Sequence, residues 1–261
     1  MRHSSLALRI LLSTTIPVAS LVAQAPAGSS WFEAGGFYHY VSNDFGNWKG
    51  GYARAVLSSA RNVWYVDARA QDAFHDSGIY GSLANVHVFS DWFYTHLGVG
   101  GGTGDYVLPD LRADASLNFK IGPSRSVVVT FGGTWVESKD AFRDQALFSS
   151  LSWYQSSAVL IEVGGRLNWS QPNTVRSARG TGSLTLGRMG SAVVTLRGSV
   201  GTEGYQLTGA PETLEKFRSQ EASISWRQWI TGRFGTVVGG EWYHNPSYTR
   251  TGFTAGVFYA W

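Results

Sequence analysis

The sequence contains no cysteine among its 261 residues. A disulfide framework and a thiolate metal site are therefore both excluded. Charged residues are also scarce, at 15% of the chain, against roughly 25% in average soluble domains. The formal net charge is only +3, which is too weak to indicate nucleic-acid binding. We therefore expect no nucleic-acid partner.

Long hydrophobic runs are missing beyond the first 25 residues, and no later stretch approaches the ~18 apolar residues of a membrane helix. Residues 1–25 themselves predict a cleaved signal peptide. Arg2 and Arg9 supply positive charge, the stretch Leu6–Val22 is mostly apolar, and Ala23-Gln24-Ala25 matches a small-x-small cleavage pattern. Cleavage after Ala23 and an uncleaved membrane anchor are the alternatives. A single domain is expected over residues 26–261.

Aromatic residues and glycine are abundant instead, with 11 tryptophans, 12 tyrosines, 14 phenylalanines and 32 glycines. A soluble core seldom needs so many tryptophans. A membrane barrel does, because an indole at the membrane surface keeps its ring in apolar surroundings and its N–H at the headgroups. Glycine suits strands that bend and pack closely around a closed sheet.

The chain divides into segments of about ten residues in which apolar and polar side chains alternate, separated by turn residues. The clearest segment is Leu111–Ile121, and the final residues Gly252–Trp261 show the same period and end on an aromatic. We predict an all-β fold, a transmembrane antiparallel up-and-down β-barrel of about 14 strands, with 12 as the alternative. For the last segment alone, a strand of a soluble β-sandwich is the competing interpretation.

The predicted connections alternate in length, and the longer ones lie near residues 101–110, 137–145 and 201–217. Outer-membrane barrels keep short turns on the periplasmic side and long loops outside. We therefore expect the outer membrane of a Gram-negative bacterium, with both termini periplasmic. The expected partners are outer-membrane lipid, lipopolysaccharide and, through the C-terminal strand, the barrel-assembly machinery.

Charged side chains fall almost entirely on one face of the predicted strands. An ionised Arg or Lys facing lipid at mid-membrane costs roughly 2–4 kcal/mol, so this face is expected to line the lumen. The two signs are nearly balanced, which leaves two interpretations open: charges paired within a closed wall, or a water-filled passage. The predicted lumen-lining residues are Glu33, Arg54, Asp67, Arg69, Arg112, Asp114, Lys120, Glu162, Arg166, Arg197, Glu221, Arg227 and Glu241.

Most tryptophans lie near the ends of predicted strands, as in the aromatic belts of a membrane barrel. The predicted girdle comprises Trp31, Trp64, Trp135, Trp153, Trp169, Trp226, Trp242 and Trp261. The alternative for Trp229 and Tyr243 is sugar stacking inside the lumen.

Catalytic motifs are weak. His75-Asp76-Ser77 contains suggestive residue types, but adjacent loop residues diverge too much to form a triad. The glycines at 100–104 are not followed by Lys-Ser or Lys-Thr, so they predict no phosphate loop. We expect no catalytic residues, no metal and no cofactor.

Four segments, GGTGDYVLPDLRADASLNFK, GTEGYQLTG, FRSQEASISWRQW and NPSYTRTGFTAGVF, resemble the YaiO family of outer-membrane β-barrel proteins. The similarity extends from about residue 31 to the end and rests on scattered Gly, Tyr, Trp and Arg positions. The resemblance implies an outer-membrane barrel and brings no settled activity.

The expected function is therefore a passage for polar solutes or saccharides, or support for envelope polysaccharide export. A closed structural or surface-interaction barrel is the first alternative. A lipid- or peptide-modifying enzyme at the rim, with His75 or His244 as base, is the second.

Overall fold

The computed structural model describes residues 8–9, 30–139, 142–172, 174–207 and 214–261. The predicted signal peptide lies outside these residues, apart from Leu8 and Arg9, which form a two-residue strand β1 paired with Leu207 and Gln206. No helix in the described ranges has the length and apolar character needed to cross a membrane.

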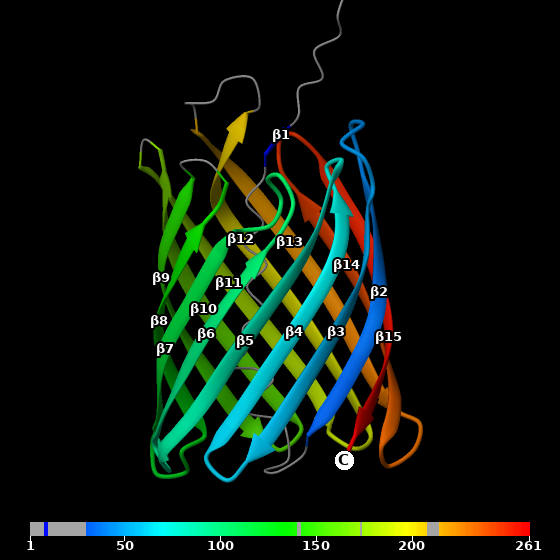
Figure 1. Ribbon diagram of the computed structural model, residues 1–261. Helices are drawn as coiled ribbons and strands as arrows, with labels where there is room; N and C mark the ends of the chain where they lie inside the picture. Colours follow the sequence, from blue (N-terminus) through cyan, green and yellow to red (C-terminus); the bar gives the residue numbers. More distant parts are fainter. Residues whose placement is uncertain (1–7, 10–29, 140–141, 173, 208–213) are drawn as a thin grey trace, which may run out of the picture.

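The described residues form a closed barrel of 14 antiparallel strands, β2 to β15 (Figure 1). The strands are β2 Trp31–Val41, β3 Trp48–Ser59, β4 Asn62–Ala73, β5 Asp76–Ser90, β6 Phe93–Gly102, β7 Leu111–Ile121, β8 Val127–Glu137, β9 Arg143–Ser156, β10 Val159–Gln171, β11 Val175–Arg188, β12 Ala192–Leu207, β13 Leu214–Trp229, β14 Phe234–His244 and β15 Thr249–Ala260.

Each strand pairs with its neighbours in sequence, and β15 pairs with β2 to close the ring. The predicted up-and-down barrel is thereby confirmed, and the 12-strand and sandwich alternatives are wrong. In Figure 1 the turns that follow the even-numbered strands β2, β4 and β6 lie at the upper end, and the C-terminus lies at the lower end. We call the upper end, which carries residues 42–47, 103–110 and 245–248, the loop end.

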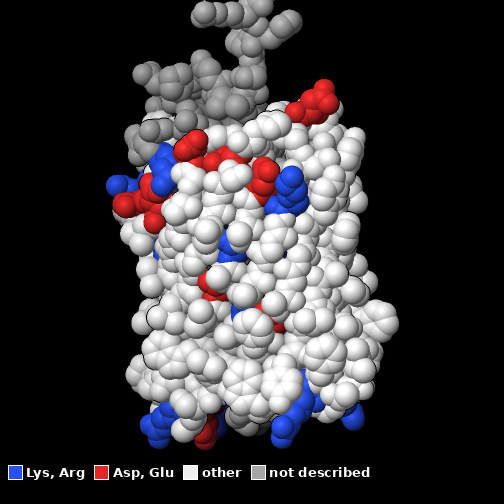
Figure 2. All heavy atoms as spheres, turned by 45° about the vertical axis from the view of Figure 1, so that its right-hand side comes forward, with Lys and Arg blue, Asp and Glu red and all other residues white. Residues whose placement is uncertain are grey.

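The alternation of side chains explains why these segments are strands. In β7, Leu111, Leu117 and Ile121 are exposed on the outer surface, while Ser116 and Asn118 are buried on the inner one. A soluble sheet would show the reverse pattern. In Figure 2 the charged atoms of one face gather mainly near its two ends, and only a few are visible at mid-height. The outer wall is therefore an apolar band.

The predicted long loop at 201–217 is largely wrong. The β12–β13 ladder continues through Gly201↔Ser219 and Glu203↔Phe217, and strand β12 ends only at Leu207. The two-residue period is concealed there because the outer face also carries glycine and polar residues, such as Thr202 and Gly204. Residues 208–213 lie outside the described ranges.

Several inward aromatic rings pack closely against glycines of the neighbouring strand. A Cβ added to Gly132 would lie 2.3 Å from the Phe148 ring, and one added to Gly235 would lie 2.3 Å from the Phe258 ring. Tyr52 lies in the same way against Gly35, with its hydroxyl 2.7 Å from the added Cβ. At these positions the bulky side chains therefore lie against the barrel wall. The lumen is wider there than it would be if the same side chains pointed toward its centre.

Candidate functional site

The predicted lumenal charges all lie on the less exposed, inward face of their strands. The structure gathers most of them into separate clusters. Lys120 instead lies over the Tyr94 ring, 5.7 Å from its centroid, and Glu162 accepts a 2.7 Å hydrogen bond from Ser152 Oγ. Arg197 stands between Ser183 and Ser223 in the strand register.

The first cluster, which we call the seam network, crosses the junction of the first and last strands of the barrel. Arg227 of β13 forms an ion pair with Glu33 of β2. Arg54 Nη1 lies 4.0 Å from Glu33 Oε1, and Arg54 Nε donates to Asp67 Oδ2 at 2.7 Å. Glu33 is only 2% exposed. A carboxylate so buried is tolerated because two guanidinium groups compensate its charge.

Trp31 corrects the predicted girdle. Its side chain is 7% exposed, and the Arg227 guanidinium lies 4.8 Å from its ring centroid, so Trp31 faces the lumen. The position is near a strand end, as predicted for a belt, but it shares the inward face with Glu33. The other predicted girdle residues lie on the outward face: Trp169 is half-buried, and the exposed ones are Trp64, Trp135, Trp153, Trp226, Trp242 and Trp261.

A second cluster lies toward the loop end. Glu241 forms an ion pair with Arg250, and the Arg250 guanidinium lies 4.2 Å from the centroid of the Trp48 ring. The Arg69 guanidinium lies 5.2 Å from the centroid of the Phe37 ring. Arg250 was not among the predicted lumenal residues because it stands at the start of the last strand, where the alternating pattern is short.

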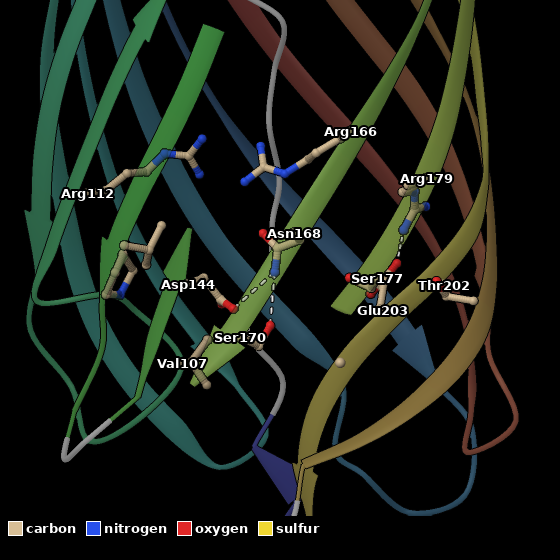
Figure 3. Close-up of a pocket in the computed structure, with 13 residues that line it drawn as sticks. Val107, Arg112, Asp144, Arg166, Asn168, Ser170, Ser177, Arg179, Thr202 and Glu203 are labelled. Carbon is tan, nitrogen blue, oxygen red and sulfur yellow. Dashed lines mark hydrogen bonds and ion pairs between the residues drawn. The ribbon is translucent and has the colours of Figure 1, made fainter. Parts of the chain in front are cut away.

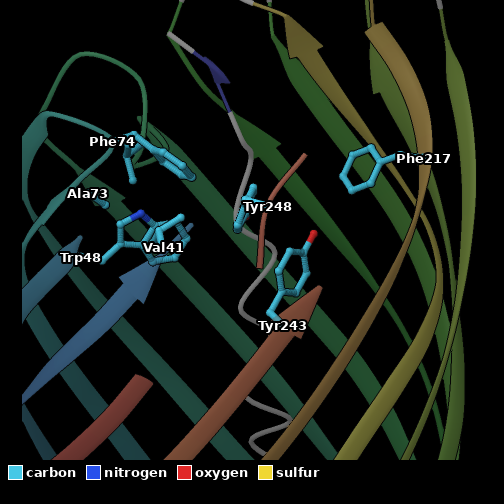
Figure 4. Packing of buried hydrophobic residues seen from close by; sticks show 8 residues of the cluster. Val41, Trp48, Ala73, Phe74, Phe217, Tyr243 and Tyr248 are labelled. Atoms are coloured by element: carbon cyan, nitrogen blue, oxygen red, sulfur yellow. The ribbon is translucent and has the colours of Figure 1, made fainter. Parts of the chain in front are cut away.

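An apolar cluster lies beside this ion pair and narrows the loop end (Figure 4). We call it the mouth cluster; its members are Val41, Trp48, Ala73, Phe74, Val107, Phe217, Tyr243 and Tyr248. Tyr248 comes from the turn between β14 and β15. Burial is the main cause that raises the pKa of its phenol, to about 12, so the hydroxyl stays protonated at neutral pH.

Asp76 holds the 103–110 loop against the mouth cluster. Its carboxylate accepts hydrogen bonds from the backbone N–H groups of Asp105, Tyr106 and Val107, at 2.9, 2.9 and 2.8 Å. The Tyr106 hydroxyl also donates to the carbonyl oxygen of Phe74. The loop is therefore fixed over the rim, and Val107 joins the mouth cluster.

A cavity of about 60 Å³ lies between β7 and β12 and borders the 103–110 loop, because Val107 and Pro109 also line it (Figure 3). Its charged lining residues are Arg112, Arg166, Arg179, Asp144 and Glu203. Asn168 Nδ2 donates to Asp144 Oδ1 at 3.1 Å and to Ser170 Oγ at 2.9 Å. The cavity has room for a few water molecules or one small oxyanion.

Sequence reasoning missed three of these charges. Arg179 lies on the inward face of β11, but its partner Glu203 lies within the loop expected at 201–217, and Asp144 within the loop expected at 137–145. Arg179 forms ion pairs with Glu203 and, at 2.9 Å, with Glu221. Only the extension of β12 beyond Val200 brings Glu203 onto the inner wall.

The histidines considered as bases have other roles. Asp76 is committed to the 103–110 loop, so it does not orient His75. His244 is exposed, its Nδ1 lies 2.9 Å from Thr249 Oγ1, and its ring stacks on Trp242. Within the described ranges, no group of three or more His, Asp or Glu side chains is arranged to hold a metal ion.

A closed 14-strand barrel with an apolar outer band and a charged lumen defines a membrane β-barrel of the outer-membrane class. Residues 31–206 match the family model of the YaiO membrane beta barrel domain. The chain therefore belongs to the YaiO family, as its sequence resemblance indicates. No curated protein sequence matches it.

Solved structures share the fold at low sequence identity. The CymD monoaromatic hydrocarbon channel is 8% identical, with a TM-score of 0.59 over 94% of this chain and 91% of that one. An outer membrane channel from Pseudomonas putida F1 is 8% identical, with a TM-score of 0.57 over 90% and 96%. A bacterial polysaccharide outer membrane secretin is 7% identical, with a TM-score of 0.52 over 90% and 99%.

Proposed function

We propose that this protein is a non-catalytic outer-membrane passage for small polar solutes such as saccharides. The observation that carries the proposal is the cavity between β7 and β12, where arginines, carboxylates and hydroxyl groups face one space. A hydroxyl-rich solute exchanges hydrogen bonds with such a wall, whereas an apolar solute would leave these polar groups unpaired.

The fold neighbours support a passage in general. CymD is a channel for monoaromatic hydrocarbons, but the polar lining here favours a different class of solute. Similarity to the polysaccharide secretin supports a second form of the proposal, in which the barrel assists envelope polysaccharide export.

A closed structural barrel is the competing function, and two observations favour it. The seam network pairs charges along the wall, and the mouth cluster with the 103–110 loop narrows one end. Both features reduce the open cross-section of the lumen.

Conductance of the refolded barrel in a planar bilayer tests the proposal. Steady current steps are expected, together with liposome swelling that is faster for a pentose than for a trisaccharide. A heat-modifiable, folded barrel that gives neither conductance nor swelling would establish the closed alternative. Transport of an aromatic hydrocarbon in preference to the pentose would also contradict the proposal.

We also propose that the loop end faces outward and that both termini are periplasmic. A short peptide tag inserted after Gly104 should then be labelled in intact cells by an impermeant reagent. A tag after Gly190, in the turn between β11 and β12, should be labelled only after the outer membrane is permeabilised. The reverse pattern would overturn the orientation.

A further inference from the structure

Arg166 is the arginine in the cavity whose charge is least compensated. In the β10–β11 ladder it stands directly opposite Arg179, and both side chains point inward. Like charges at directly opposed positions destabilise a sheet unless something compensates them. Arg179 has two carboxylate partners, Glu203 and Glu221. Among the described residues, Arg166 has no carboxylate within the 4.0 Å limit of an ion pair.

The contact that Arg166 does make is modest. Its Nη1 donates to Thr134 Oγ1 at 3.3 Å, which uses one of its five N–H donors. Thr134 in turn donates to Asp114 Oδ1 at 2.9 Å. The nearby carboxylate of Asp114 is thus reached only through a hydroxyl group, and the remaining guanidinium donors of Arg166 face the cavity.

Arg112 adds a second guanidinium to the same space. Figure 3 shows the side chains of Arg112 and Arg166 extending toward each other from β7 and β10. Arg112 donates to both oxygens of Asp114, at 2.7 and 2.9 Å. Asp114 therefore already accepts three hydrogen bonds, two from Arg112 and one from Thr134. The other carboxylate on this side, Asp144, accepts a hydrogen bond from Asn168.

We infer that Arg166, assisted by Arg112, binds the oxyanion group of an acidic, hydroxyl-rich solute, an inference that rests on the proposed function. A guanidinium fork matches the two oxygens of a carboxylate or phosphate. Ser177, on the inward face of β11, adds a hydroxyl group to the same cavity as a partner for a sugar hydroxyl. A uronic acid and a sugar phosphate share this chemistry. The volume of about 60 Å³ fits the charged group rather than a whole sugar ring.

The test compares the wild type with Arg166→Gln and Arg166→Lys, and with Arg176→Gln as a matched control. Arg176 is an exposed arginine on the outer face of β11, so its replacement removes the same charge without touching the lumen. Sodium glucuronate, inorganic phosphate and glucose are the probes. Binding to the folded protein in detergent is measured by calorimetry, and interruption of the bilayer current is measured in parallel.

Glucuronate or phosphate should bind the wild type and Arg176→Gln, and Arg166→Gln should weaken binding by about tenfold or more because a charge-assisted fork is lost. Arg166→Lys should lie between them, and glucose should bind all variants equally weakly. Preference for glucuronate over phosphate would identify a uronate as the solute group, and the opposite order a phosphate.

The outcomes separate the inference from the proposed function. If the barrel conducts and Arg166→Gln binds the oxyanion as tightly as the wild type, the inference about Arg166 is wrong. The proposed passage function then still stands. If oxyanion binding depends on Arg166 but the folded barrel does not conduct, the proposed passage function is wrong. The inferred oxyanion site then still stands. A gel shift between boiled and unboiled samples verifies that each variant is folded.

Discussion

Arg227 of β13 and Glu33 of β2 form an ion pair, although β14 and β15 lie between their strands. The Arg227 guanidinium reaches across by lying over the Phe258 ring of β15, 4.4 Å from its centroid. The pair therefore links both sides of the junction at which the barrel closes. It stands beside the backbone ladder that joins β15 to β2.

The Glu33→Gln variant should be strongly destabilised, because it leaves the buried Arg227 without its carboxylate partner, while Arg54 keeps only Asp67. Breaking a buried ion pair on one side costs about 3–5 kcal/mol. Urea unfolding in lipid vesicles measures the change. The exposed pair Arg143–Glu137 provides the control, since Glu137→Gln should cost no more than about 1 kcal/mol. Equal losses in both variants would contradict a special role for the seam network.

Asp76→Ala should release the 103–110 loop, because three backbone N–H groups lose their acceptor. Chymotrypsin should then cleave at Tyr106 faster in proteoliposomes, and any conductance should increase. Asp105→Ala is the matched control, since its exposed side chain is not the acceptor of these bonds. If both variants were cleaved at the wild-type rate, the loop would be held by the mouth cluster rather than by Asp76.

Gly132→Ala should be destabilising, because the new methyl group would lie 2.3 Å from the Phe148 ring and 2.6 Å from the Ala115 carbonyl oxygen. Overpacking of this kind costs about 1–3 kcal/mol. At the control position Gly165, the nearest atom to an added Cβ, the Arg179 carbonyl oxygen, is 3.8 Å away. Gly165→Ala should therefore be nearly neutral. Adding Phe148→Leu should recover part of the stability lost in Gly132→Ala.

Trp226→Phe should reduce the share of tryptophan fluorescence that brominated lipids quench, because Trp226 is 47% exposed on the outer face. Trp31→Phe should remove only unquenched emission and so slightly raise that share, because Trp31 lies in the lumen. Quenching that falls with Trp31→Phe would place this residue in the lipid belt after all.

The sequence predicts the barrel well because lipid enforces the alternation of side chains. The predicted bounds of β7, Leu111–Ile121, agree with the structure. The same rule fails where the outer face carries glycine and polar residues, as at the ends of β12 and β13. There the ladder hydrogen bonds, rather than hydrophobic contrast, define the strands.

The candidate site is less predictable than the fold. Alternation places Arg112 and Arg166 in the lumen, but it does not reveal that Asp114 serves Arg112 and leaves Arg166 with a threonine. That distinction depends on strand register, which turn lengths and packing determine together. Trp31 shows a second limit of the sequence prediction. Its place near a strand end favours the aromatic belt, but its side chain points into the lumen.

The pairing of β15 with β2 has a consequence for the order of folding. Among β2 to β15, every other ladder joins strands that are adjacent in sequence, whereas this one joins the first of these strands to the last. Its formation carries the largest loss of chain entropy of any pairing, so it is expected to form late. Until then the edges of β2 and β15 stay unsatisfied and open to pairing with another chain. Conditions that delay this one contact should therefore favour oligomers linked edge to edge over unfolded monomers.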